Sequence, residues 1–166
     1  MNIYILRHGI AVETGTPGFE DSNRPLIPKG RRRLRAAAAA MKKMKLSFDL
    51  ILSSPFVRAK QTAEIAAEEL KLKKQLQLSD ALAPGDSMKT LVQQLNEWKP
   101  APEDVLLVGH EPHLSRLISL LVTGDENAAV EMKKGGLCKL EVDFLHVGRC
   151  ARLAWLLTPS QMELMS

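Results

Sequence analysis

The chain has 166 residues, of which 45% are hydrophobic and 25% charged, a balance typical of one globular domain, here expected to span residues 1–166. Aromatic residues make up only 4%, so the sequence lacks the rings on which a nucleic-acid-binding surface stacks bases. The formal net charge of +4 favours anionic ligands without indicating a polynucleotide.

The first half of the chain alternates strand patterns with helix patterns. The apolar run NIYILR at 2–7 predicts a strand that ends abruptly in charged residues. A helix is expected at about 30–45, because apolar residues recur there at steps of three and four. The run FDLILSS at 48–54 predicts a second strand, and Ser54 before Pro55 is placed to cap the next helix. The apolar stripe of the first helix consists of Leu34, Ala37, Met41 and Met44.

The second half continues this alternation and ends in two adjacent strand patterns. The pair DS at 86–87 can cap a helix, and the continuous apolar run DVLLVGH at 104–110 is typical of a strand covered on both faces. Pro112 then begins another helix. The runs at 138–144 and 151–158 predict a hairpin with a turn near HVGR. The expected class is α/β, with three layers (α/β/α) and a mostly parallel central sheet that ends in an antiparallel hairpin.

Cationic and titratable residues follow three of these strands. Arg7 and His8 end the first strand, and Gly9 would leave room for a phosphate and for the turn. Arg58 lies in the first turn of the helix after the second strand, and His110 ends the third. Ligands of open α/β sheets bind beyond the carboxyl ends of the strands, so these side chains should meet at one edge. Guanidinium groups grip phosphate oxygens and a neutral imidazole can attack phosphorus, so we expect phosphoryl chemistry there.

The same segments carry a family resemblance. LRHG after the first strand, SSPFVRAKQTAE in the middle and VLLVGHEPHLS late in the chain resemble the histidine phosphatase superfamily, which has the phosphoglycerate mutase-like fold. The short chain and the segments DSNRPLIPKG, LAPGDS and WLLTP resemble, within that superfamily, the phosphohistidine phosphatases of the SixA type. The motifs follow in the family's order along nearly the whole chain, and together they are specific.

The resemblance implies a role for each matching residue. His8 would be the nucleophile that becomes phosphorylated, and Arg7, Arg58 and His110 would complete the phosphate pocket. Arg24 would be an added contact to the substrate that Asp21 holds in place, although a purely local ion pair explains the same two residues equally well. No metal ion or cofactor is implied.

The proton donor of the larger superfamily members has no clear counterpart. Asp80, Asp86 and Glu111 are the candidates, but a loop position, a helix cap and a second helix cap explain them as simply. A positioned general acid contributes roughly 10²–10⁴-fold to a rate. An imidazole leaving group needs less help than an alkoxide, because histidine titrates near neutrality. A weak or missing acid therefore agrees with phosphohistidine as the substrate.

Three further features have simpler explanations than a separate site. HEPH at 110–113 differs in spacing from the H-E-x-x-H zinc motif, and Pro112 interrupts the helix across it. The basic run KGRRRLR at 29–35 is either the solvated face of a helix or a docking surface for an acidic partner. Cys138 and Cys150 form no C-x-x-C pair and are expected to be reduced and unpaired.

We therefore expect a metal-independent phosphatase that removes the phosphoryl group from phosphohistidine on a protein of a phosphorelay or phosphotransfer system and releases inorganic phosphate. The alternatives are a phosphomonoesterase or mutase for a small phosphorylated metabolite and an inactive module that binds phosphate or a phosphoprotein. Neither a nucleic acid nor a membrane is an expected partner. The N-terminus does not read as a signal peptide, and the apolar runs are too short to span a bilayer. A cytoplasmic monomer is therefore expected.

Overall fold

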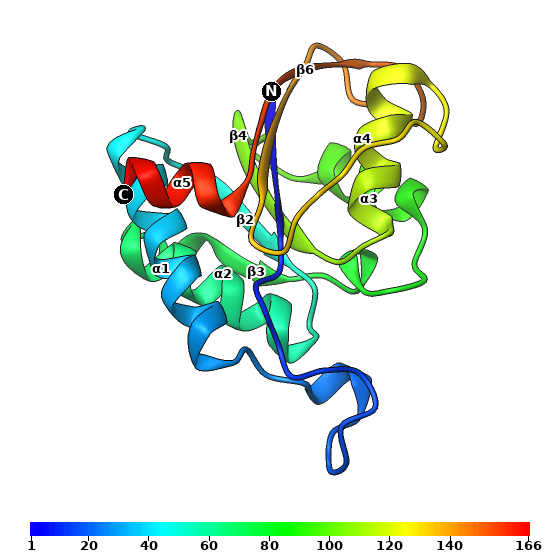
Figure 1. Cartoon of the computed structure of the whole chain (residues 1–166). Helices are drawn as coiled ribbons and strands as arrows, with labels where there is room; N and C mark the ends of the chain where they lie inside the picture. Colours follow the sequence, from blue (N-terminus) through cyan, green and yellow to red (C-terminus); the bar gives the residue numbers. More distant parts are fainter.

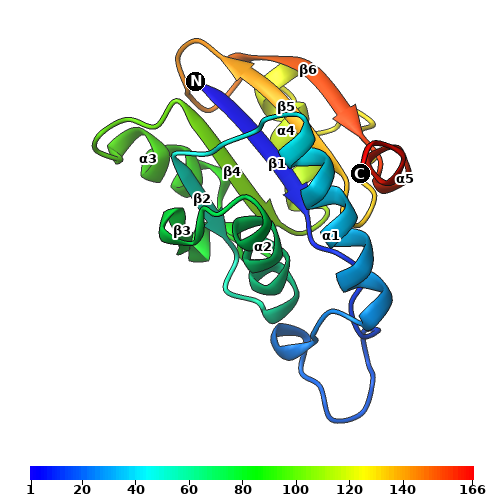
Figure 2. The same ribbon diagram turned by 90° about the vertical axis from the view of Figure 1, so that its left-hand side faces the viewer.

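The computed structural model describes residues 1–166, and its centre is a six-stranded sheet (Figures 1 and 2). The strand order is β3-β2-β4-β1-β5-β6. The strands are β1 (Asn2–Arg7), β2 (Leu50–Ser53), β3 (Leu76–Leu78), β4 (Asp104–Gly109), β5 (Leu137–Val142) and β6 (Ala151–Leu157). Strands β1 to β4 run parallel, whereas β5 is antiparallel to β1 and β6 to β5. The expected α/β class, with a parallel centre and a terminal hairpin, is confirmed.

Helices cover both faces of this sheet. They are α1 (Pro28–Lys43), α2 (Val57–Glu69), α3 (Met88–Glu97), α4 (His113–Thr123) and α5 (Pro159–Met165). Figure 1 shows α1, α2 and α5 on one side of the sheet and α3 and α4 on the other. Strand β1 serves both layers, because Ile3 and Ile5 join the core under α3 and α4 while Tyr4 and Leu6 join the core under the other helices. No helix combines the length and the apolar character that crossing a membrane requires.

The central strands end at one level. β4 and β1 are neighbours in the middle of the sheet, and β2 borders β4. In the parallel register Arg7 lies opposite Gly109, and Ser53 lies opposite Val108. The residues that follow the three strands therefore start from adjacent points on the carboxyl edge of the sheet. These residues are His8, Ser54 and His110.

Helix α2 begins later than the sequence indicated, and the prediction that Ser54 caps it was wrong. The helix starts at Val57 with Phe56 as its N-cap. Ser54 stays extended because its N–H donates to the Val108 carbonyl at 2.9 Å, and because a residue before proline is disfavoured in the helical conformation. Its hydroxyl accepts from the Phe56 N–H at 3.3 Å and faces the candidate site instead.

Two elements at the margins of the fold were not predicted. Strand β3 has only three residues, among them the exposed Gln77, so it shows no apolar run. Helix α5 is short, although Thr158 and Gln161 form a capping box at its start. The side chain of Arg33, in the basic run, pairs with Glu163 of α5 at 2.7 Å. The basic run is thus partly structural, because it joins α1 to the last helix.

The terminal hairpin has a longer connection than the predicted turn at 146–149. Val142 pairs with Ala151, so the loop spans 143–150. Cys138 lies on β5, Cys150 lies in the loop, and both are free, as expected. Burial raises the pKa of the Cys138 thiol to about 12, so it stays protonated at neutral pH.

Candidate active site

His8 lies directly beyond β1, and its ring is held between two partners. Its Nδ1 is 2.7 Å from the carbonyl oxygen of Gly9, and Arg58 Nε donates to its Nε2 across 3.3 Å. Because a carbonyl oxygen can only accept, the ring hydrogen sits on Nδ1 and Nε2 keeps its lone pair. His8 therefore has the tautomer that nucleophilic attack through Nε2 requires.

The surroundings keep this ring neutral. Burial is the main reason that the pKa of His8 falls from its ordinary value of 6.5 to about 3. The positive charges of Arg58, Arg7 and Lys134 lower the pKa further, whereas the hydrogen bond to the Gly9 carbonyl acts in the opposite direction. At pH 7 Nε2 is therefore unprotonated, and its lone pair accepts the hydrogen bond from Arg58.

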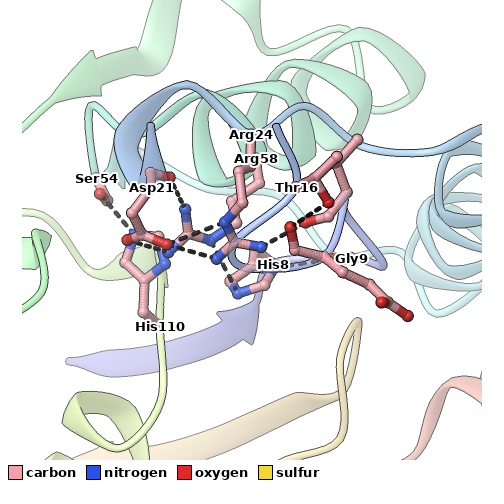
Figure 3. A network of polar contacts seen from close by, with 10 residues as sticks. His8, Gly9, Thr16, Asp21, Arg24, Ser54, Arg58 and His110 are labelled. Carbon is pink, nitrogen blue, oxygen red and sulfur yellow. Dashed lines mark hydrogen bonds and ion pairs between the residues drawn. The ribbon is translucent and has the colours of Figure 1, made fainter. Parts of the chain in front are cut away.

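Asp21 ties two arginines together beside His8 (Figure 3). Its carboxylate accepts from Arg24 Nη2 at 2.7 Å and from Arg58 Nη2 at 3.3 Å, and its carbonyl accepts from Arg58 Nη1 at 2.6 Å. Partial burial acts to raise the pKa of Asp21, but the hydrogen bonds and charges of Arg24 and Arg58 lower it below its ordinary value of 3.8. The ionised carboxylate of Asp21 thus fixes the orientation of the Arg58 guanidinium group. Arg24 makes the local ion pair and also lines the hollow described below.

His110, beyond β4, brings a second imidazole to within 5.2 Å of His8, measured between ring centroids. Its Nε2 is 2.8 Å from the Ser54 hydroxyl, while its Nδ1 is buried without a hydrogen-bond partner. Arg7 shows the same feature, because its Nε is buried and unpartnered although Nη1 donates to the Met132 carbonyl at 2.7 Å. Buried polar groups normally have partners. Arg7 and His110 line the same hollow, and a hollow with two cationic or titratable side chains of this kind suits a ligand rich in oxygen acceptors.

One hollow of about 410 Å³ contains all of the sequence-predicted site residues. They are Arg7, His8, Asp21, Arg24, Arg58 and His110. Of the three carboxylates considered as proton donors, Glu111 also lines this hollow, whereas Asp86 lines a neighbouring one and Asp80 lines neither. Oε1 of Glu111 accepts from the Ser115 N–H at 2.9 Å, so this residue also caps α4. The arrangement can bind a small oxyanion and present it to a neutral imidazole.

Two contributors to the site were not identified from the sequence. Ser54 holds the His110 ring, and the sequence suggested a cap instead. Lys134 lines the hollow from the turn before β5. The sequence KKGG at 133–136 could have indicated this role of Lys134. Two glycines after two lysines predict a turn, and a turn exposes its side chains.

The interpretation of Gly9 as room for a phosphate was wrong. A Cβ at Gly9 would lie 2.5 Å from Cδ1 of Leu34 and 3.3 Å from Cδ2 of Leu26. The missing side chain therefore lets α1 pack closely against the end of β1. The Gly9 N–H donates to the Thr62 hydroxyl at 3.1 Å, which fixes this loop to α2.

The two histidines of HEPH do not converge. His110 faces the hollow with His8, whereas His113 is buried against a separate hollow that contains Asp86. The chain has no group of three or more His, Cys, Asp or Glu side chains arranged to hold a metal ion.

Comparison with known proteins agrees with this geometry. Residues 3–84 match the histidine phosphatase superfamily (branch 1). The chain is 31% identical over 128 residues to the phosphohistidine phosphatase SixA of Escherichia coli strain K12. The aligned region covers 75% of this chain and 76% of that protein. The chain belongs to the histidine phosphatase superfamily.

Within this superfamily the chain is SixA-like. The structure of the protein histidine phosphatase SixA complexed with tungstate superposes with a TM-score of 0.81 at 26% identity, over 96% of this chain and 98% of that one. The mycobacterial glucosyl-3-phosphoglycerate phosphatase shares the fold, with a TM-score of 0.70 at 22% identity over 92% of this chain and 96% of that one. The phosphoglycerate mutase-like architecture expected from the sequence is thereby confirmed, and the chain is a phosphatase of this superfamily.

The buried histidines of this phosphatase predict a stability that falls in acid. Burial, followed by the charges of His8 and Arg58, lowers the pKa of His110 to about 3, as for His8. Both pKa values lie below the ordinary 6.5, so the unfolded chain binds more protons than the folded chain between about pH 3 and pH 6.5. The contribution of these two groups to the free energy of unfolding is complete above pH 6.5 and is lost as the pH falls towards about 3. Each histidine lowers the free energy of unfolding by up to about 1.4 kcal/mol for each pH unit of this fall.

Urea unfolding midpoints measured between about pH 7 and pH 5 in phosphate-free buffer test this expectation. Replacing both His8 and His110 by asparagine should reduce the slope, and the buried His113, whose pKa burial also lowers, should account for the part that is left. The exposed His146 provides the matched control, and H146N should keep the slope of the wild type. A wild-type midpoint that does not change over this range would contradict the burial argument.

Proposed function

We propose that this chain is a protein phosphohistidine phosphatase that works through a phosphorylated His8. The observation that carries the proposal is the fixed tautomer of His8, whose unprotonated Nε2 lies 3.3 Å from a guanidinium nitrogen of Arg58. A lone pair held beside a cation that binds phosphate suits attack on phosphorus. The SixA proteins are the relatives that support phosphohistidine as the substrate.

In the first step Nε2 of His8 forms a bond to phosphorus while the P–N bond of the substrate breaks. The substrate imidazole keeps the bonding electrons and takes up a proton from the solvent, to which the attacking water of the second step returns one. Arg7 and Arg58 neutralise the charge on the transferred phosphoryl group, and the ring of His110 lines the hollow beside it. Met132, Asp21 and Ser54 fix these three side chains before the substrate arrives, so little reorganisation is required.

In the second step a water molecule attacks the phosphorus of phospho-His8. The P–N bond breaks, Nε2 recovers its lone pair, and inorganic phosphate leaves with the oxygen of the water. Three carboxylates line the hollow, and Asp21 is committed to two arginines. Of the other two, Glu13 and Glu111, we assign the proton exchange to Glu111, because it directly follows His110 in the chain. An imidazole leaving group needs little protonation from an enzyme acid, which agrees with a capping role for Glu111.

A phosphatase for a small metabolite is the second candidate, because the mycobacterial glucosyl-3-phosphoglycerate phosphatase has the same fold. The relevant measurement compares kcat/KM for a phosphohistidine-bearing carrier protein, a phosphoserine peptide and a phosphorylated sugar acid. We expect the carrier protein to be preferred by at least about 10²-fold, because alkoxide leaving groups need the stronger acid.

Comparable kcat/KM values on phosphoserine and phosphohistidine would contradict this preference. A higher value on the sugar acid phosphate would identify the metabolite as the substrate. An inactive binding module would show no turnover of any of the three. The proposal includes a cytoplasmic location, in keeping with two free cysteines.

A further inference from the structure

A second hollow, of about 540 Å³, adjoins the one that contains His8. Arg7 and Lys134 line both hollows and form the boundary between them. The second hollow extends from this boundary to Arg33 on α1 and to the first residues of α5. A group attached to a phosphoryl donor could therefore enter it while the phosphoryl group lies beside His8.

The turn that carries Lys134 is fastened to the end of β1. The Gly136 N–H donates to the Lys133 carbonyl at 2.7 Å, and Gly135 has a φ of +81°, which a glycine adopts without strain. The Gly135 N–H reaches the carbonyl oxygens of Arg7 at 3.0 Å and of His8 at 3.1 Å. The backbone of the turn is thus fixed relative to the nucleophile, and Lys134 projects from a rigid base.

Positive charges exceed negative charges in the lining of the second hollow. Its lining contains four cations, and two of them have acidic partners, since Arg33 pairs with Glu163 and Lys133 pairs with Glu131. Arg7 and Lys134 take part in no ion pair, although the charge of Glu111 acts to raise the pKa of Arg7, and the side chain of Lys134 makes no hydrogen bond. An exposed lysine without a partner, next to an arginine with an unpartnered nitrogen, leaves net positive charge at the boundary.

The hollow on the Glu111 side of the site does not share this character. It contains the carboxylates of Asp86, Glu111 and Glu126, against the two cations Lys89 and Arg116. The catalytic hollow is therefore bordered by a cationic hollow beyond Lys134 and by a mixed, slightly acidic one beyond Glu111. A third adjoining hollow contains Glu111 and Glu131, with Arg7 as its one cation. Of the three neighbours, the cationic hollow therefore suits an additional negative charge on the substrate best.

We propose that the cationic hollow binds a second anionic group of the substrate, a carboxylate or a phosphate, and that Lys134 determines this specificity. The inference rests on the phosphatase activity proposed above. In a protein substrate the group is an acidic side chain close to the phosphohistidine, and in a small molecule it is a second acid group. Arg7 contributes to both groups because it lines both hollows.

The test uses two matched pairs of substrates. One pair consists of phosphohistidine peptides that differ only by glutamate or glutamine beside the phosphohistidine. The other consists of 3-carboxyphenyl phosphate and its neutral amide analogue, 3-carbamoylphenyl phosphate. We expect the wild type to prefer the anionic member of each pair by about three- to fivefold, mainly through KM, since an exposed ion pair has an effect of this size. The preference should shrink in roughly 0.5 M NaCl.

Variants at position 134 assign the preference to this side chain. K134A should lose most of it, K134E should reverse it, and K134R should retain it because the charge is kept. The exposed Lys74, which also lacks an ion-pair partner, is the matched control, and K74A should behave as the wild type. A wild type without a preference, or a K134A variant that keeps it, would overturn the proposal.

The two proposals fail in different ways. If the peptides are not hydrolysed but the aryl phosphates show a preference that depends on Lys134, the phosphohistidine function is wrong and the second anion site stands. If the peptides are hydrolysed equally well with glutamate and glutamine by all variants, the function stands and the second anion site is wrong.

Discussion

Replacement of His8 by alanine is expected to lower kcat/KM by about 10⁴-fold or more, the largest loss that any single substitution in this chain should cause. The variant lacks the only unprotonated nitrogen that Arg58 contacts in the hollow. It should also fail to form a covalent intermediate. Mixing wild type and H8A with a labelled phosphohistidine carrier, followed by quenching in alkali, measures both the loss of label from the carrier and its appearance on the enzyme.

The control for this experiment is the exposed His146, and H146A should retain wild-type rates. Circular dichroism and the unfolding midpoint of H8A check that the fold survives the loss of a buried ring. Full activity of a folded H8A variant would exclude the mechanism, whatever the substrate. If label still appears on the H8A enzyme, a residue other than His8 is the one that becomes phosphorylated.

Replacement of Arg58 by alanine is expected to lower kcat/KM by about 10³-fold, comparable with the loss of a principal charge-stabilising donor in other active sites. The guanidinium contacts Nε2 of His8 and both the carbonyl and the carboxylate of Asp21, so it positions the nucleophile as well as the phosphoryl group. R58K should recover little of this rate, because an ammonium group lacks the planar fork that makes these contacts simultaneously.

Inhibition by vanadate, which mimics pentavalent phosphorus, provides a second measurement for Arg58. We expect R58A to weaken vanadate binding in parallel with the loss of kcat/KM. The exposed Arg35 of the basic run is the matched control, and R35A should leave both quantities unchanged. An R58A variant that binds vanadate as tightly as the wild type would show that Arg58 acts on the nucleophile alone.

The convergence of the site could be predicted because it depends on parallel strands. Apolar runs marked β1, β2 and β4, and residues that follow parallel strands necessarily meet at one edge. The lateral order of the strands could not be deduced in the same way, since it is determined by pairing between distant segments. Lys134 escaped prediction for this reason: its turn reaches His8 only because β5 pairs with β1.

Asp21 and Ser54 show a different limit. Each has a polar side chain with a local partner, which is Arg24 for Asp21 and the Phe56 N–H for Ser54. The structure gives both a second task, because Asp21 also holds Arg58 and Ser54 also holds His110. Sequence patterns report the local partner of such a residue, whereas a partner more than thirty residues away becomes visible only in three dimensions.

The hydrogen bond between Nδ1 of His8 and the Gly9 carbonyl has a regiochemical consequence. Imidazole can be phosphorylated on either nitrogen, and the two products are chemically distinct isomers. Because Nδ1 is engaged by a neighbouring backbone oxygen at 2.7 Å, no phosphorus atom can approach it in this fold. Any phosphoryl group that His8 accepts must therefore reside on Nε2. Under the proposed mechanism, the backbone of one residue thus determines which isomer of phosphohistidine forms at His8.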